Sequence, residues 1–257
     1  MSNSKKKTVL IQSMDALTDD VFSMWLKDEE IAANATPGQF VSLYCNEGSR
    51  LLPRPISICE IDKAVGAIRL VYRVVGKGTE EFSKMKKGDT IEVMGPLGNG
   101  FPLDNEGKKV ILIGGGIGIP PMLELSKHLT GEKQVVLGYR DELFLEKEFE
   151  SYGKVYISTE DGSVGTKGNV IDAIKENGLD AEVIYACGPT PMLRGIKAYA
   201  IEHGITAWLS LEEKMACGIG ACLACVCKSK EVDHHTNVDN KRICKEGPVF
   251  NALEVEL

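Results

Sequence analysis

The sequence lacks the features that mark secreted, membrane-spanning and nucleic-acid-binding proteins. Its 257 residues carry a formal net charge of −7, which argues against a surface that binds nucleic acid. The polar residues 1–7 are not followed by the apolar run of a signal peptide, so we expect a cytoplasmic protein. The most apolar stretch, residues 110–123, is broken by four glycines and two prolines. It is too short to span a bilayer, so we expect no membrane segment.

What is present is the composition of an ordinary globular protein. Hydrophobic residues make up 43% and charged residues 26% of the chain, which are typical values. The length suggests two domains or one large one. The unusual feature is a set of eight cysteines. Without a secretion signal, so many cysteines indicate metal chemistry in a reducing compartment.

Four of the cysteines have the spacing of an iron–sulfur site. Cys217, Cys222 and Cys225 form a C-x4-C-x2-C array, and Cys244 follows after eighteen residues. This is the plant-type arrangement of thiolates around a [2Fe–2S] cluster, with a shorter final gap. Four thiolates are needed because each iron takes two terminal ligands beyond the bridging sulfides. Two glycines between the first two cysteines allow the loop to curl and to turn its N–H groups towards the cluster sulfurs.

A zinc site and a pair of disulfides are the competing interpretations. Structural zinc sites usually show two short C-x2–4-C knuckles, whereas Cys244 stands alone, and disulfides need an oxidising compartment. Cys227 is a rival fourth ligand, but a second element must close the loop, which favours Cys244. A Rieske-type centre would pair His234 and His235 with only two cysteines, and we expect these histidines to lie in a solvated loop.

The first hundred residues read as short strands separated by turns. The strands that we expect are residues 7–13, 21–27, 39–45, 56–62, 67–75 and 90–94. Strands of this length and spacing indicate an antiparallel barrel or sandwich. A helix is expected at residues 79–85, with Thr79 as its N-cap. Residues 95–107 look like a linker.

Three segments of this region have the chemistry of a ligand site. The first, at residues 54–57, combines a cation, a rigid turn and a hydroxyl, and the second, at residues 71–73, combines an aromatic ring and a cation. The third, at residues 76–79, is a glycine turn that runs into a helix N-terminus, which attracts anions. Taken singly, each is better explained as a surface cation, a core tyrosine or an ordinary turn. The segments are Arg54, Pro55, Ile56 and Ser57; Val71, Tyr72 and Arg73; and Gly76, Lys77, Gly78 and Thr79.

The pattern changes after residue 108 to alternating strands and helices. Residues 109–113 form a continuous apolar run, as in a parallel sheet that is covered on both faces. We expect further strands at 134–139, 154–159 and 182–187, and helices at 121–129, 169–177 and 191–203. This alternation predicts a doubly wound α/β sheet, in which nucleotides bind at the carboxyl ends of the strands.

Two motifs lie at expected strand ends in this half. One is the glycine run of Gly114, Gly115, Gly116 and Gly118, and the other is the triplet Cys187, Gly188 and Pro189. A tight strand-to-helix connection and a buried core thiol are the alternatives. At the next strand end, Arg140 is followed by Asp141 and Glu142, and this charge balance favours NAD over NADP.

Together these motifs resemble the ferredoxin–NADP reductase superfamily, whose flavin motif R-x-[YF]-S here has Ile56 in place of the aromatic residue. The resemblance implies FAD, with Arg54 on its pyrophosphate and Ser57 near the isoalloxazine edge. It also implies that the glycines approach the NAD pyrophosphate and that Cys187 lies near the nicotinamide. With the C-terminal cysteines, the whole chain is similar to the electron-transfer subunits of type B dihydroorotate dehydrogenases.

We therefore expect a multi-domain α+β protein. Its parts are an antiparallel β-barrel that binds FAD (residues 1–104), a doubly wound α/β domain that binds NAD (105–211) and a small [2Fe–2S] domain (212–257). The resemblance implies an NAD-linked oxidoreductase subunit that carries electrons between NAD(H) and the FMN of a dihydroorotate dehydrogenase catalytic subunit in pyrimidine (UMP) synthesis. The resemblance also implies that the two subunits form a hetero-oligomer, namely a heterotetramer. The cofactors perform the chemistry, so we assign no catalytic acid, base or nucleophile to this chain.

Two other functions remain open from the sequence. The first is a diaphorase-type FAD and [2Fe–2S] subunit of a hydrogenase or of a ferredoxin–NADP oxidoreductase. The identity of the partner or a substrate assay would distinguish this function from that of a dihydroorotate dehydrogenase subunit. The second is a cluster-bearing redox sensor, which would not oxidise NADH steadily. The sensor hypothesis leaves both nucleotide motifs without a purpose, so agreement of several motifs favours an electron-transfer subunit.

Overall fold

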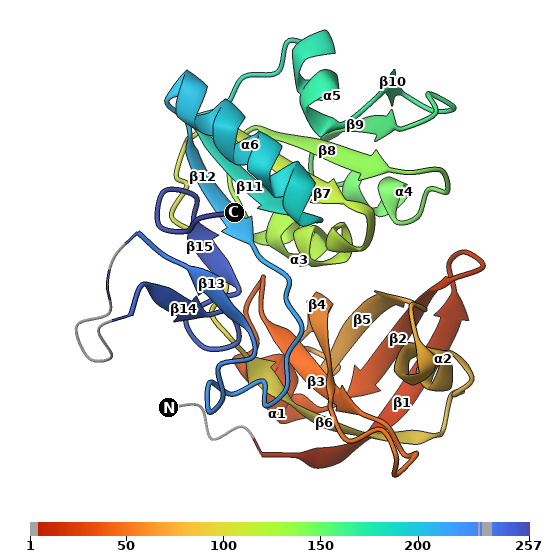
Figure 1. Ribbon diagram of the computed structural model, residues 1–257. Helices are drawn as coiled ribbons and strands as arrows, with labels where there is room; N and C mark the ends of the chain where they lie inside the picture. Colours follow the sequence, from red (N-terminus) through yellow and green to blue (C-terminus); the bar gives the residue numbers. More distant parts are fainter. Residues whose placement is uncertain (1–4, 231, 233–237) are drawn as a thin grey trace.

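The computed structural model describes residues 5–230, 232 and 238–257 (Figure 1). The two histidines considered for a Rieske-type centre, His234 and His235, lie outside the described residues. A β-barrel comes first along the chain, an α/β half follows, and the C-terminal segment, blue in Figure 1, lies alongside both. Among the described residues, none of the helices has the length and apolarity needed to cross a bilayer.

The barrel is closed by six antiparallel strands in the order β1-β2-β5-β4-β3-β6. Alternate side chains of these strands point inward and form its core, which includes Ile11, Met24 and Leu70. The expectation of an antiparallel barrel is thereby confirmed. The strands are β1 (Lys7–Ala16), β2 (Val21–Lys27), β3 (Phe40–Tyr44), β4 (Arg54–Asp62), β5 (Ala67–Arg73) and β6 (Thr90–Leu97), and the helices of this half are α1 (Glu29–Asn34) and α2 (Lys77–Ser83).

Three local predictions for the barrel were wrong or incomplete. Helix α2 begins at Lys77 with Gly76 as its N-cap, so Thr79 is the third helical residue. Its Oγ1 instead reaches back and accepts hydrogen bonds from the N–H groups of Val75 at 3.0 Å and Gly76 at 3.3 Å, the reciprocal half of a capping box. Strand β6 runs on through the first residues of the expected linker. Helix α1 was missed, although Asp28 caps it.

The α/β half is built on a seven-stranded sheet in the order β10-β9-β8-β7-β11-β12-β15. All of its pairs are parallel except the pair of β12 with β15. The doubly wound sheet that the alternating pattern predicts is therefore confirmed. Its elements are β7 (Val110–Gly115), η1 (Gly116–Gly118), α3 (Pro120–His128), β8 (Lys133–Tyr139), α4 (Glu146–Phe149), β9 (Lys154–Thr159), β10 (Thr166–Lys167), α5 (Val170–Glu176), β11 (Val183–Cys187), α6 (Thr190–His203), β12 (Thr206–Ser210) and β15 (Val249–Asn251).

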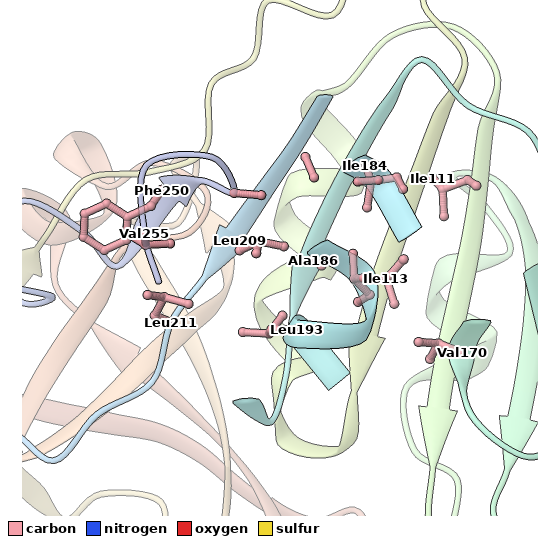
Figure 2. Close-up of a cluster of buried hydrophobic side chains, with 14 of the residues drawn as sticks. Ile111, Ile113, Val170, Ile184, Ala186, Leu193, Leu209, Leu211, Phe250 and Val255 are labelled. Atoms are coloured by element: carbon pink, nitrogen blue, oxygen red, sulfur yellow. The ribbon is translucent and has the colours of Figure 1, made fainter. Parts of the chain in front are cut away.

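Each face of this sheet is covered by different elements. Figure 2 shows the face under α5 and α6, where Ile113 and Leu193 pack together and Phe250 extends the same core into the C-terminal segment. On the other face, α3 and α4 pack in a core that also contains Val21 and Val71 of the barrel. Residues of the barrel and of the sheet thus pack together in this second core, which is separate from the core inside the barrel.

The C-terminal segment belongs to both halves. Its short hairpin consists of β13 (Val226–Lys228) and β14 (Asn240–Arg242). Beyond the hairpin, β15 adds to the edge of the sheet beside β12. On the barrel side, the amide of Asn99 donates hydrogen bonds to the carbonyls of Lys245 at 3.2 Å and Glu246 at 2.9 Å. The segment therefore bridges the barrel and the sheet.

Candidate redox cofactor sites

The four predicted cluster ligands come together as two pairs of thiols. Cys217 Sγ lies 3.3 Å from Cys222 Sγ, and the thiol of Cys244 is hydrogen-bonded to Cys225. Among the described residues, no three side chains of cysteine, histidine, aspartate or glutamate converge as the ligands of a single metal ion would. Two pairs fit a binuclear cluster, because each of its irons needs two thiolates from the protein.

The loop between the first two cysteines is shaped to surround sulfur. Gly218 and Gly220 have φ values of 68° and 80°, a conformation that costs glycine little. The N–H of Gly220 donates to Cys244 Sγ at 3.1 Å, and the N–H of Cys222 donates to Cys217 Sγ at 3.4 Å. Such N–H groups stabilise thiolates and cluster sulfurs. The donor set and the loop therefore fit a [2Fe–2S] group.

Burial and hydrogen bonding act differently on the two pairs of thiols. Burial alone would raise the pKa of Cys217, but backbone N–H donors, with Ile219 first among them, lower that pKa to about 6. Burial raises the pKa of Cys244 to about 12, and the hydrogen bond and charge of Cys225 add to the effect. Cys217 is thus more readily deprotonated than Cys244.

The fifth cysteine of this region lies apart from the two pairs. Cys227 is in β13, and its Sγ is 3.6 Å from the carbonyl oxygen of Lys241 on the facing strand β14. Cys244, in contrast, follows β14, and its Sγ accepts a hydrogen bond from the N–H of Gly220 in the loop. This placement favours Cys244 over Cys227 as the fourth ligand, which remains a prediction.

Arg242 holds the cluster loop, a role that the sequence reading did not assign to it. Its Nη1 donates to the carbonyl of Gly220 at 2.8 Å, and its Nε donates to Glu246 Oε2 at 3.1 Å. Burial alone would raise the pKa of Glu246, but the hydrogen bonds that Glu246 accepts from Arg242 lower it. The sequence signal that could have indicated this role is a cation two residues before Cys244.

Arg54 and the start of α2, which are predicted to contact the flavin pyrophosphate, lie against each other. A Cβ built on Gly78 would lie 2.1 Å from Arg54 Nε, so only glycine lets the guanidinium rest against this turn. The guanidinium also donates to the carbonyl of Leu52. A cation beside the free N–H groups of a helix start fits an anion such as phosphate.

The other predicted flavin residues differ in what they offer a ligand. Ile56 and Ser57, with Pro55, are half-buried along β4, whereas Val71 is buried in the core shared with the sheet. Tyr72 is 1% exposed, inside the barrel, and stands edge-on to Phe82. The core-residue alternative therefore describes the Tyr72 side chain.

Arg73, the last of that segment, lies at the edge of the same region. Its Nε is 3.3 Å from Asp20 Oδ2 but has no hydrogen-bond partner among the residues that the structure describes. A buried guanidinium N–H in this state fits an acceptor on a bound molecule. Arg73 therefore remains in the predicted flavin set.

The two nucleotide motifs meet at the ends of neighbouring strands. In the parallel pair of β7 and β11, Gly114 is opposite Cys187. A Cβ on Gly118 would lie 2.4 Å from the carbonyl oxygen of Cys187. The two loops are thus in backbone contact, which glycine alone allows at this position.

The remaining glycines of the two motifs divide into packed and open positions. A Cβ on Gly115 would lie 2.3 Å from Met192 Sδ, and one on Gly188 would lie 2.3 Å from Met192 Cε. Gly116 has a φ of 52° and faces open space. Pro189 is the N-cap of α6. Tight packing explains Gly115 and Gly188, and the open backbone at Gly116 fits a pyrophosphate.

Cys187 itself is a buried, neutral thiol. Burial raises its pKa to about 12, although a hydrogen bond with Ser210 acts in the opposite direction. At the next strand end, the guanidinium of Arg140 is paired with Asp141 at 3.0 Å. An arginine that is already paired with a carboxylate is less available to a 2′-phosphate, which agrees with the expectation of NAD.

An ion network joins the barrel to the nucleotide half. Arg69 of β5 donates to Glu60 of β4 at 2.5 Å and to Glu148 of α4 at 2.6 Å. Lys127 of α3 is 2.6 Å from the other oxygen of Glu60. Glu124, which is 2% exposed, accepts a hydrogen bond from the N–H of residue 61 at 2.9 Å. These contacts fix α3, which follows the glycine run, against the barrel.

Solved structures with the same arrangement define the class of the protein. The NADH-dependent reduced ferredoxin-NADP oxidoreductase superposes with a TM-score of 0.87 at 32% identity, covering 96% of this chain and 89% of that chain. A ferredoxin NADP+ reductase from Neisseria gonorrhoeae with bound FAD and NADP shares the fold alone, with a TM-score of 0.65 at 18% identity over 78% of this chain and 92% of that one. The fold and the paired thiols define a flavin reductase of the ferredoxin reductase type, extended by an iron–sulfur segment.

Family models and curated relatives narrow this class. A model described as oxidoreductase FAD-binding domain matches residues 10–101, and the iron-sulfur cluster binding domain of dihydroorotate dehydrogenase B matches residues 212–256. The dihydroorotate dehydrogenase B (NAD(+)) electron transfer subunit of Fusobacterium nucleatum is 45% identical over 94% of this chain and 95% of its own length. The chain belongs to the family of electron transfer subunits of dihydroorotate dehydrogenase B.

Proposed function

We propose that the chain carries electrons between NAD(H) and the FMN of a dihydroorotate dehydrogenase catalytic subunit, by way of FAD and one [2Fe–2S] cluster, in pyrimidine synthesis. The observation that supports this proposal most strongly is the presence of two pairs of thiols beside the barrel. The two nucleotide motifs also meet in the same chain. When bound, FAD supplies two-electron exchange with NADH and the cluster supplies one-electron steps.

The chain's own residues bind and orient these groups. We propose Cys217, Cys222, Cys225 and Cys244 as the cluster ligands. Arg54 would hold the flavin pyrophosphate with the turn at Gly78. The glycine run from Gly114 and the triplet from Cys187 would hold NAD. No acid, base or nucleophile of the protein is required, because the cofactors perform the chemistry.

The proposed division of labour follows the expected domains. Residues 1–104 would bind FAD, residues 105–211 would bind NAD, and residues 212–257 would bind the cluster. The ion network around Arg69 supports this division, because it holds the first two parts in one orientation. Hydride exchange between a flavin and a nicotinamide depends on such fixed placement.

The surface of the cluster loop supports a protein partner. Leu223 is 75% exposed and Ile219 is 51% exposed, and both lie between or beside proposed ligands. Exposed apolar side chains that gather around a redox centre indicate an interface. We propose that this face, defined by Ile219 and Leu223, docks on the FMN-containing catalytic subunit in a hetero-oligomer, as a heterotetramer. Thiolate ligands of a cluster need a reducing compartment, which supports a cytoplasmic location.

Anaerobic purification of the tagged chain tests this proposal. We expect a coloured protein with one FAD, two irons and two sulfides per chain, and mass spectrometry should identify a dihydroorotate dehydrogenase among the proteins that co-purify. A colourless, flavin-free chain that stays so after reconstitution would contradict the cofactor assignment. Co-purification of a hydrogenase instead would contradict the partner.

One observation favours a second candidate function. The superposition with the NADH-dependent reduced ferredoxin-NADP oxidoreductase covers nearly the whole chain, so a role as the diaphorase-type subunit of such an enzyme is the alternative. Sequence identity is higher to the dihydroorotate dehydrogenase subunits, at 45% against 32%. Reduction of NADP+ by reduced ferredoxin, without activity towards dihydroorotate, would favour the alternative.

A further inference from the structure

The cluster loop crosses a buried hydroxyl of the barrel that has no hydrogen-bond partner among the described residues. Ser42 of β3 is 1% exposed, and its Oγ has no hydrogen-bond partner within the part of the chain that the structure describes. Its neighbours Val41 and Leu43 belong to the barrel core, so Ser42 points to the outer side of the strand. An unpaired buried hydroxyl is costly, and in native proteins it indicates a missing acceptor.

The cluster loop is what covers this hydroxyl. A Cβ built on Gly218 would lie only 2.9 Å from Ser42 Oγ, so the loop and the strand touch at this point. Gly218 directly follows the proposed ligand Cys217. Tyr44 lies two residues further along the same side of β3; burial raises its pKa, and the charge of Cys217 also raises it. The outer side of β3 therefore faces the loop at Cys217 and Gly218.

We infer that Ser42 donates a hydrogen bond from the flavin barrel to the sulfur of the iron–sulfur site, at the Cys217 thiolate or an adjoining cluster sulfide. The inference rests on the proposed function, because it requires the cluster. It makes Ser42 a residue that touches the cofactor from outside the cysteine segment. A hydrogen bond to sulfur stabilises the reduced cluster, which carries one more negative charge, and therefore raises its reduction potential.

A redox titration of the purified holoprotein tests this inference. EPR follows reduction of the cluster, and visible absorbance follows reduction of the flavin in the same sample. Ser42→Ala should keep the cluster but shift its potential to a more negative value, while the flavin potential stays unchanged. Ser42→Thr retains the hydroxyl, so its cluster potential should remain close to that of the wild type. Resonance Raman bands of the Fe–S modes should also lose part of their shift in D2O in the alanine variant.

Ser158 provides a matched control. It is a second buried serine whose Oγ has no partner among the described residues, and it lies in β9 of the nucleotide sheet, away from the cysteine segment. Ser158→Ala should leave the cluster potential unchanged. An unchanged potential in Ser42→Ala would overturn the inference, and so would a shift confined to the flavin. Absence of a cluster from the wild-type protein would instead overturn the proposed function.

Discussion

Close contacts of single residues decide which group a motif can hold. Gly78 leaves room for the Arg54 guanidinium, and Gly118 leaves room for the backbone of Cys187. Gly116, in contrast, has no atom near the position of a Cβ. The glycines of one motif therefore serve different purposes: some allow the protein to pack on itself, and one leaves backbone open to a ligand.

Substitution of the cysteines tests the two thiol pairs. Cys217→Ser, Cys222→Ser, Cys225→Ser or Cys244→Ser should each abolish or severely reduce the cluster, because an iron loses a thiolate. Cys227→Ser is the control, since its thiol contacts the carbonyl of Lys241 instead. Iron and sulfide counts with EPR provide the measurement. Loss of iron in the Cys227 variant, with full iron in the Cys244 variant, would assign the fourth ligand to Cys227.

Removal of the Arg54 side chain tests the flavin site. Arg54→Ala should weaken FAD binding by about 1.5–3 kcal/mol, the usual contribution of a hydrogen bond to a charged group, or about 10- to 150-fold in Kd. Lys84→Ala is the control, because Lys84 lies at the other end of α2 and pairs with Glu80. Fluorescence titration of the flavin-stripped protein measures both affinities. Equal FAD affinity in both variants would argue against this site.

Among the elements, α3 has the central position. It follows the glycine run, packs on one face of the sheet, and contacts the barrel through Glu124 and Lys127. Arg69 completes the junction from the barrel side. Burial alone would lower the pKa of Arg69, but the hydrogen bonds that it donates to Glu148 and Glu60 raise it. The guanidinium therefore stays charged, and its loss would remove the cation that Glu148 and Glu60 share, leaving Glu60 with Lys127.

Replacement of this arginine by an apolar residue of similar length should destabilise the fold. Removing one partner of a buried ion pair costs about 3–5 kcal/mol, and Arg69→Met should fall at the lower end because the Glu148 side chain is 41% exposed. Urea unfolding of the FAD-loaded protein provides the free energy. Lys109→Met removes an exposed pair with Asp180, so its unfolding free energy should stay close to that of the wild type. Equal losses in the two variants would show that the junction is not buried in solution.

Local patterns predicted most elements, and contacts between distant segments explain the errors. The apolar run at residues 109–113 and the alternation after it were sufficient for the parallel sheet. Strand β15 was not predicted, because its three residues gain their partners only from β12. Thr79 was mistaken for an N-cap because a hydroxyl can cap a helix start from inside the first turn as well. Residue spacing predicted the cysteine set, whereas the contact of Ser42 with the loop depends on packing.

At the scale of the whole molecule, the C-terminal segment makes the three parts interdependent. It crosses the barrel at Gly218, returns to Asn99 through the turn at residues 243–246, and then adds β15 to the nucleotide sheet. A cluster held in this way lies beside the flavin barrel on one side. On the other side it presents Leu223 and Ile219 to solvent. This geometry suits electron transfer from the cluster to another protein.

A charge placed on the exposed face should block the partner without affecting the cofactors. Leu223→Arg should weaken association with the catalytic subunit at least tenfold, because desolvating an unpaired charge in an interface costs more than about 1.4 kcal/mol. Val65→Arg is the control: Val65 is 52% exposed but lies at the turn between β4 and β5. Isothermal titration calorimetry measures both affinities. Equal affinities would place the interface elsewhere on the chain.

Reconstitution with the catalytic subunit tests the central claim most directly. The measurement is the rate of NAD+ reduction with dihydroorotate as the electron donor, with each protein alone and with the two combined. We predict that this chain alone passes electrons from NADH to artificial acceptors but does not oxidise dihydroorotate, and that the FMN-containing subunit alone does not reduce NAD+. The combined proteins should form orotate and NADH in equal amounts. A combined sample that forms no NADH, although each protein retains its cofactors and the two associate, would contradict the account.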